Sequence, residues 1–228
     1  MKGEEGDLAL PDYAQLRSEL VAVAGLDDPT ERLLEVAAVI VAALSDLNVE
    51  PVVVGGLALA YWAESSDIIT GDIDMIVRRS PELDERLARL GFEKHGREWS
   101  LPGFEVAFEA PSEVMEPGDT GEWAELASGR RVKVLSIEDA LLWRLREWVF
   151  WHHSSGFRQA THLLLSDKLD QARLEQRASE EGLGLALAEL RRLTAQLDAG
   201  QPLEEWQISE AGKRVERDSF SRPKPREG

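Results

Sequence analysis

Residues 51–78, PVVVGGLALAYWAESSDIITGDIDMIVR, contain the pattern that decides the fold of this chain. A short β-branched run, Val-Val-Val, ends in Gly55-Gly56, and a run of helix-forming residues follows it. After a polar loop, polar and apolar residues alternate from Asp72 onward. Alternation with a period of two is typical of a strand, and it puts Asp72 and Asp74 on one face. The stretch therefore predicts a strand, a helix and a second strand, with glycines and carboxylates at the junctions.

The two aspartates have the spacing of metal ligands. Their Cα atoms are about 7 Å apart on an extended strand, and carboxylate oxygens are the ligands that Mg²⁺ prefers. Gly55-Gly56 stands at the start of the predicted helix, where unpaired N–H groups and the helix dipole attract anions. Each feature also has an ordinary interpretation, as a strand-to-helix turn or as solvated acids on a strand. Together they favour a site for a phosphate and a divalent metal.

Paired glycines, a helix and the sequence TGDID at 70–74, in that order, resemble the polymerase-β-type nucleotidyltransferase superfamily. Within it, the stretch is most similar to bacterial minimal nucleotidyltransferases and to abortive-infection toxin-type nucleotidyltransferases. The resemblance implies an α/β (α+β) nucleotidyltransferase fold, in which a mixed β-sheet with helices on one face precedes a C-terminal helical domain. It also implies transfer of a nucleoside monophosphate from a triphosphate, with Mg²⁺ or Mn²⁺ as the cofactor.

By this resemblance three carboxylates act as catalytic metal ligands. Asp72 and Asp74 are the first two, and the third comes from the run FEVAFE at 104–109. Alternation puts Glu105 and Glu109 on the same polar face of that strand. The spacing to the following loop resembles the family segment and favours Glu109, while Glu105 remains the alternative. A glutamate here departs from the aspartate that the family usually has.

The resemblance also indicates residues that bind the nucleotide. Gly55 and Gly56 would bind phosphate through the backbone, because the serine that many family members have after the first glycine is absent. Thr70 is expected to orient the aspartate that follows it, or the turn. Arg144 and Arg158 lie on predicted helices that overhang the cleft in the family, so they are candidate triphosphate ligands. Surface or ion-paired arginine is the ordinary alternative for both.

Three segments are predicted along the chain: a nucleotidyltransferase core with N-terminal helices (1–135), a helical domain (136–200) and a polar tail (201–228). The tail is expected because Gly-Gln-Pro ends the last strongly helical pattern, and residues 212–228 carry more basic than acidic side chains. Besides the two strands of the opening stretch, strands are predicted at 92–95, 97–101, 104–109, 122–126 and 131–135. Helices are predicted at 12–26, 29–47, 57–64, 81–90, 168–181 and 184–198. The residues that follow the capping sequence at 136–139, including the segment 156–160, are also expected to be helical.

Composition limits the classes of function. The 228 residues contain no cysteine, which excludes disulfides and thiolate metal sites. The net charge of −17 repels polyanions, so no long nucleic acid is expected as a partner. A nucleotide remains compatible, because a bound divalent cation reverses the sign of the local charge. The longest apolar block is about half a membrane span, so we expect no membrane association and a cytoplasmic location.

The resemblance, together with these limits, implies a metal-dependent enzyme that transfers NMP from an NTP to a hydroxyl group. The acidic charge favours a small-molecule or protein acceptor, and tRNA stays open because toxin-type relatives act on it. Such relatives belong to toxin–antitoxin systems, so a partner protein of a two-gene module is a further open prediction. The alternative is a non-catalytic protein with the same fold, serving as an antitoxin or an interaction module.

Overall fold

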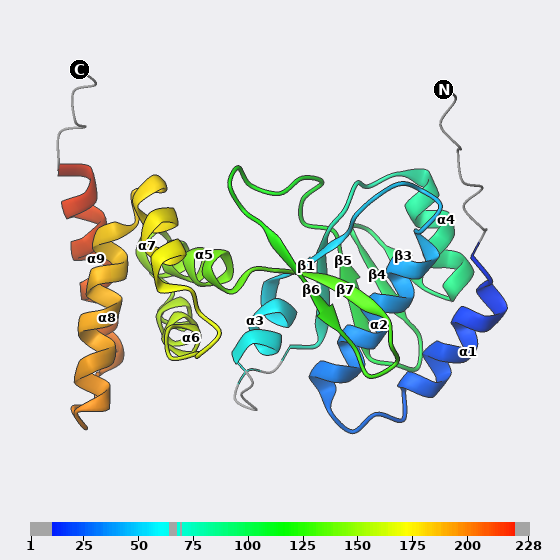
Figure 1. Cartoon of the computed structure of the whole chain (residues 1–228), viewed down its shortest axis with the longest axis horizontal. Coiled ribbons are helices and arrows are strands. Elements are labelled where there is room, and N and C mark those ends of the chain that lie inside the picture. Colours follow the sequence, from blue (N-terminus) through cyan, green and yellow to red (C-terminus); the bar gives the residue numbers. More distant parts are fainter. Residues whose placement is uncertain (1–10, 64–67, 69, 222–228) are drawn as a thin grey trace, which may run out of the picture. The chain divides into compact units, whose positions relative to one another are not determined.

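The computed structural model describes residues 11–63, 68 and 70–221, and the chain divides into two compact units, 1–135 and 136–228 (Figure 1). Within the described residues, the first unit contains a seven-stranded sheet and four helices, and the second unit contains five helices. The predicted architecture, an α/β fold with a mixed sheet followed by helices, is confirmed.

The sheet has the strand order β3-β4-β5-β2-β1-β7-β6. Its members are β1 (Val52–Val54), β2 (Asp72–Ile76), β3 (Glu93–His95), β4 (Glu98–Leu101), β5 (Val106–Glu109), β6 (Gly121–Glu125) and β7 (Arg131–Leu135). β2 pairs with β5 in parallel, as β1 does with β7, and the other neighbours are antiparallel. The sheet is therefore mixed, and β1 and β2 lie near its centre.

Strand pairing gives the sheet two different faces. Residues in register share a face, and a chain of pairings links five side chains that are all fully buried: Val53, Ile73, Met75, Phe108 and Val134. On the opposite face the same strands carry polar side chains that are exposed or half-buried: Asp72, Asp74, Glu109 and Lys133. One face is thus the core of the unit, and the other is open to polar chemistry.

Four helices complete the first unit: α1 (Tyr13–Val23), α2 (Pro29–Ala43), α3 (Gly55–Ala63) and α4 (Pro81–Leu90). α2 packs against α1, α3 and α4 and is buried along most of its length, as its run of apolar residues predicts. Its start is capped, because the Asp28 side chain accepts a hydrogen bond from the Glu31 N–H at 2.9 Å. Gly91 ends α4 with a left-handed φ of 103°, the usual conformation after a helix.

The second unit consists of α5 (Ile137–Phe150), α6 (Ser154–Leu164), α7 (Gln171–Glu180), α8 (Gly184–Asp198) and α9 (Glu205–Ser221). The predicted polar tail is wrong for the residues of α9. This helix buries Ile208, Ala211 and Val215, and the Trp148 indole N–H of α5 donates a hydrogen bond to the Ile208 carbonyl at 2.8 Å. The buried positions recur every three or four residues, as in an amphipathic helix. The prediction missed this helix because the many charged residues between these positions make the segment look uniformly polar.

Among the described helices, none combines the length and the apolar character that crossing a membrane requires.

The contact between α9 and Trp148 can be tested at Gly212. A Cβ atom there would lie 2.9 Å from the Trp148 carbonyl oxygen, which is too close. We expect Gly212→Ala to lower the free energy of unfolding by about 1–3 kcal/mol, although alanine normally favours a helix. Gly184→Ala at the start of α8 is the matched control, because a Cβ there meets nothing within 4 Å. Urea denaturation measures both, and equal stabilisation by the two substitutions would contradict the packing of α9.

Candidate functional site

The carboxylate of Asp74 lies directly against the first residue of α3. The antiparallel pairing of β1 with β2 sets Asp74 opposite Val54, the residue before Gly55. A Cβ atom on Gly55 would lie 2.1 Å from Asp74 Oδ2, and the φ of Gly55 is +65°. Both the space and the backbone conformation therefore require glycine here. An acidic group is held at the amino end of a helix, where backbone N–H groups lack helical partners.

A second close approach joins Gly56 to Thr70. A Cβ atom on Gly56 would lie 2.9 Å from the Thr70 hydroxyl oxygen. That hydroxyl accepts a hydrogen bond from the Asp72 N–H and donates one to the Asp72 carbonyl, both at 3.3 Å. Thr70 thus fixes the backbone at the first aspartate of β2. The sequence predicts that Gly56 acts through its backbone. It does not show that a side chain at this position would strike Thr70, because that contact forms only in the folded chain.

Carboxylates form a row across three neighbouring strands. In the parallel pair of β2 and β5, Asp74 is the register partner of Glu109, and in the antiparallel pair of β4 and β5, Glu109 is the partner of Glu98. Asp72 lies on the same face, two residues before Asp74 on β2. Sequence reasoning missed Glu98. The alternation Glu-Trp-Ser-Leu at 98–101 signals its polar face, but not its neighbour on β5.

Glu105 is separate from this row. It precedes β5, has a left-handed φ of 51° and lies outside the paired residues of that strand. The structure therefore brings Glu109, rather than Glu105, beside Asp74.

The donor set of the row fits a hard divalent cation, since Asp72, Asp74 and Glu109 offer only carboxylate oxygens. These oxygens are not gathered at one point. Among the described residues, no three carboxylates of the row bring an oxygen each within 4.8 Å of one another. The pairing of the strands brings the three acids close together. Their side chains would have to rotate before the oxygen atoms could surround one metal ion.

Arg144 and Arg158 have carboxylate partners in the second unit. Arg144 Nη1 donates to both Glu147 oxygens at 2.7 and 2.8 Å, and its side chain is mostly buried. Arg158 is exposed and donates to Glu205 on α9 at 2.6 Å. Both arginines are already paired with carboxylates, so the structure gives the ordinary interpretation of both a specific basis.

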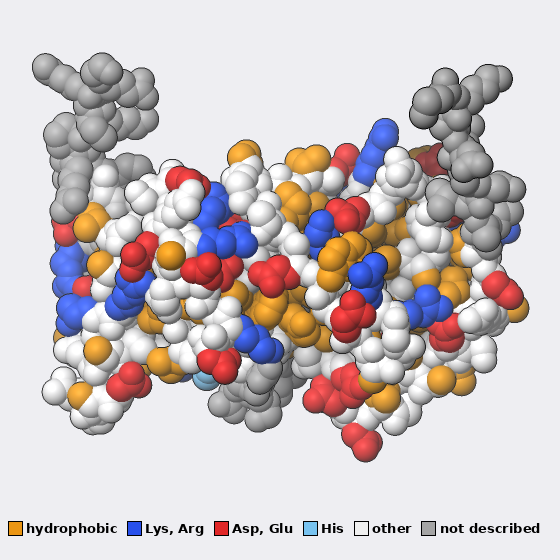
Figure 2. Space-filling view, viewed as in Figure 1, with side chains coloured by type: hydrophobic (Ala, Val, Ile, Leu, Met, Phe, Trp, Pro, Cys, Tyr) orange, Lys and Arg blue, Asp and Glu red, His pale blue; other side chains and the backbone are white. Residues whose placement is uncertain are grey.

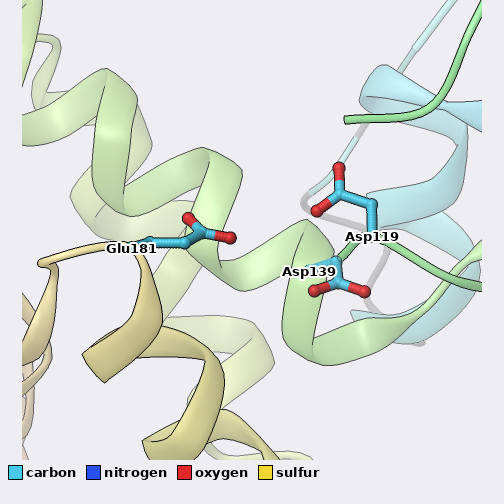
Figure 3. A group of neighbouring side chains, drawn as sticks. All are labelled: Asp119, Asp139 and Glu181. Atoms are coloured by element: carbon cyan, nitrogen blue, oxygen red, sulfur yellow. The ribbon is translucent and has the colours of Figure 1, made fainter. Parts of the chain in front are cut away.

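Three further carboxylates, Asp119, Asp139 and Glu181, are drawn in Figure 3. Each offers oxygen atoms that a divalent metal could bind. Asp119 belongs to the first unit, and the other two belong to the second unit. In the second unit the acids already bind guanidinium groups: Arg177 contacts Asp139 at 3.0 Å and Glu181 at 2.7 Å.

These ion pairs explain the two acids of the second unit without a metal. Asp139 is fully buried and also binds Arg173 at 2.7 Å. Burial by itself lowers the pKa of Arg177, but Asp139, Glu180 and Glu181 together outweigh it through hydrogen bonds and negative charge, so the pKa of Arg177 is raised. The guanidinium groups stay charged and satisfy the buried acid. We therefore interpret Asp139, Glu181 and the arginines that bind them as a structural network within the second unit.

Comparison with known proteins shows the fold. No protein-family model matches the sequence, and no curated protein matches it either. A solved structure, described as an antigenic nucleotidyltransferase-like protein from Paracoccidioides brasiliensis, is similar with a TM-score of 0.52 and 16% sequence identity. The likeness covers 81% of this chain and 94% of that one. The chain thus has a nucleotidyltransferase-like fold, and its narrower relation to minimal or toxin-type enzymes stays a prediction.

The contact between Gly55 and Asp74 predicts a strong stability effect. Gly55→Ala should lower the free energy of unfolding, because the left-handed conformation alone costs a non-glycine residue roughly 1–2 kcal/mol and the new Cβ would also strike Asp74. Asp74→Ala should remove the steric clash with the new Cβ. The loss of unfolding free energy in the double variant should therefore be smaller than the sum of the losses in the two single variants. Gly71→Ala, with nothing within 4 Å of its Cβ, is the control. Additive effects in urea denaturation would contradict the contact.

Proposed function

We propose that this chain is a metal-dependent nucleotidyltransferase that transfers NMP from an NTP to a hydroxyl group. One observation carries the proposal: Asp74 lies against the first residue of α3 and has Glu109 as its register neighbour. A phosphate-binding helix start and adjacent carboxylates are the two parts that this chemistry needs. The nucleotidyltransferase-like fold supports the same conclusion.

Each residue of the site has a role in this proposal. Asp72, Asp74 and Glu109 would hold Mg²⁺ or Mn²⁺, which when bound lowers the pKa of the attacking hydroxyl and offsets the charge of the triphosphate. The backbone N–H groups of Gly55 and Gly56 would donate hydrogen bonds to phosphate oxygens, since the first N–H groups of a helix have no helical acceptor.

Thr70 supports the site through its position. Its hydroxyl holds the backbone of Asp72 through two hydrogen bonds, which sets the direction of that carboxylate. Because the hydroxyl also lies beside Gly56, it connects the metal-binding strand to the phosphate-binding turn. Thr70 is thus a positioning residue in this proposal.

We further propose a small molecule or a protein as the acceptor. Figure 2 shows acidic and basic side chains interspersed on the visible surface of each unit, an arrangement that does not favour a long polyanion. The net charge of −17 acts in the same direction. Transfer to tRNA, and membership of a two-gene toxin–antitoxin module, would bring the chain closer to the toxin-type enzymes and are outcomes that the assay below can reveal.

A second candidate function is a non-catalytic binding protein with the same fold. The separation of the carboxylate oxygens favours this candidate, because a catalytic metal needs ligands that converge. The two functions differ in one requirement, since only the enzyme depends on the acids of the row for turnover.

Activity measurements on single variants test the enzyme. Asp72→Asn, Asp74→Asn and Glu109→Gln should each lower metal-dependent transfer by about a hundredfold or more, because each removes charge that stabilises the transition state. Glu105→Gln should stay within a few-fold of the original protein and serves as the matched control. The assay uses each α-labelled NTP with Mg²⁺ or Mn²⁺ and separate pools of tRNA, protein and hydroxylated small molecules. Equal activity in all four variants would refute the assignment of these acids, and no transfer by the original protein with any NTP or acceptor would leave the non-catalytic function ahead.

Thermal melting tests the same site without turnover. Metal and NTP together should stabilise the folded protein more than the sum of their separate effects, because the triphosphate adds metal ligands and the metal offsets its charge. At a hundredfold excess over the dissociation constant, the gain is about 2.7 kcal/mol. This corresponds to a rise in melting temperature of roughly 5–10 °C. The variant with both Asp72→Asn and Asp74→Asn should lose the joint effect, and stabilisation by NTP that survives in it would refute the proposed metal site.

A further inference from the structure

Outside the candidate site, the first unit has a cavity of about 580 Å³ between α1, α2 and the turn that joins β6 to β7. This volume lies within the range of pockets that bind small molecules, roughly 300–1,000 Å³. The turn occupies residues 126–130, and Gly129 has the left-handed φ that closes it. The cavity thus has two helices and one tight turn as walls.

Hydrogen bonds hold the turn against both helices. Glu35 on α2 is only 4% exposed, and its carboxylate accepts hydrogen bonds from the Ser128 N–H at 3.0 Å and the Ser128 hydroxyl at 2.7 Å. Arg130 donates from Nε to Glu19 on α1 at 2.9 Å. Because the walls are connected through buried and half-buried groups, the cavity is formed before any ligand arrives.

The lining combines an apolar surface with excess negative charge. Its apolar members are Ala22, Val23, Leu26, Val39 and Ala127. Its charged members are three glutamates and one arginine, and Arg130 already pairs with Glu19. Within the described part of the chain, the half-buried Glu31 carboxylate has neither an ion pair nor a hydrogen bond. The cavity therefore offers one unpaired carboxylate beside an apolar wall.

Sheet topology separates this cavity from the candidate site. β1 and β7 run in parallel, and Gly55 follows the carboxyl end of β1. The turn at 126–130 precedes the amino end of β7. Because the two strands are parallel, this turn and Gly55 lie at opposite ends of the strands. A ligand in the cavity would therefore not overlap the proposed nucleotide.

We propose that this cavity binds a small amphipathic amine, in which an apolar group ends in a protonated primary amine. The apolar group would cover the valine and leucine side chains, and the ammonium would pair with Glu31. Anionic ligands such as nucleotides are disfavoured by the glutamates. This proposal does not depend on nucleotidyl transfer, so loss of the proposed function would leave it standing.

The experiment compares two probes of nearly the same shape, 2-phenylethylamine and 2-phenylethanol, by ¹H–¹⁵N NMR titration of the full chain. We expect the amine to cause saturable shifts at residues that line the cavity and to bind at least about fivefold more tightly than the alcohol. Glu31→Gln should weaken the amine by about fivefold and leave the alcohol unchanged. Glu85→Gln, an exposed glutamate on α4 outside the cavity, is the matched control.

Three results would overturn the proposal: no saturable shift at the cavity, equal binding of the two probes, or equal effects of Glu31→Gln and Glu85→Gln. Ala22→Trp gives an independent check, because the larger side chain would fill part of the cavity. It should abolish the binding of both probes while the melting temperature shows that the protein remains folded. Undiminished amine binding in this folded variant would place the amine elsewhere and overturn the assignment.

Discussion

The lack of space between Gly55 and Asp74 is the constraint on which the candidate site depends. β1 must end and α3 must begin within one residue, while β2 passes close enough to set a carboxylate against that residue. Only glycine meets both conditions, since its φ is left-handed and its Cβ position is filled by Asp74 Oδ2. The strand, the helix and the second strand of residues 51–78 thus form one interdependent unit.

Repulsion between carboxylates on one face of the sheet is offset by apolar side chains buried on the other face. Like charges opposite each other destabilise a strand pair, and Asp74 lies opposite Glu109 in this way. Burying one large apolar side chain contributes roughly 1.5–3 kcal/mol, and Ile73, Met75 and Phe108 on the opposite face are fully buried. The core can therefore hold the carboxylates together, as is common where function requires a locally unfavourable arrangement.

The features that could be predicted from the sequence are those that depend on residues close together in the chain. Alternation predicted β2 and its two faces, and the predicted start of one helix at residue 29 and the predicted end of another at residue 90 agree with α2 and α4. Register between distant strands is not written in any one segment, so the proximity of Glu98 to Glu109 could not be predicted. The same holds for α9, whose apolar positions matter only because Trp148 and its neighbours on α5 are there to cover them.

Buried and exposed acids in this chain differ in how their charge is balanced. Asp139 and Glu35 are buried, and the protein provides each with donors of its own, from arginines or from a serine. Asp72 and Glu109 are exposed, and within the described residues their carboxylates have no ion pair. Exposed acids do not need a partner to be stable, so exposure alone says little about function. The placement of these two beside Asp74 and the start of α3 is what distinguishes them, because a cation bound there would neutralise the row and a phosphate at once.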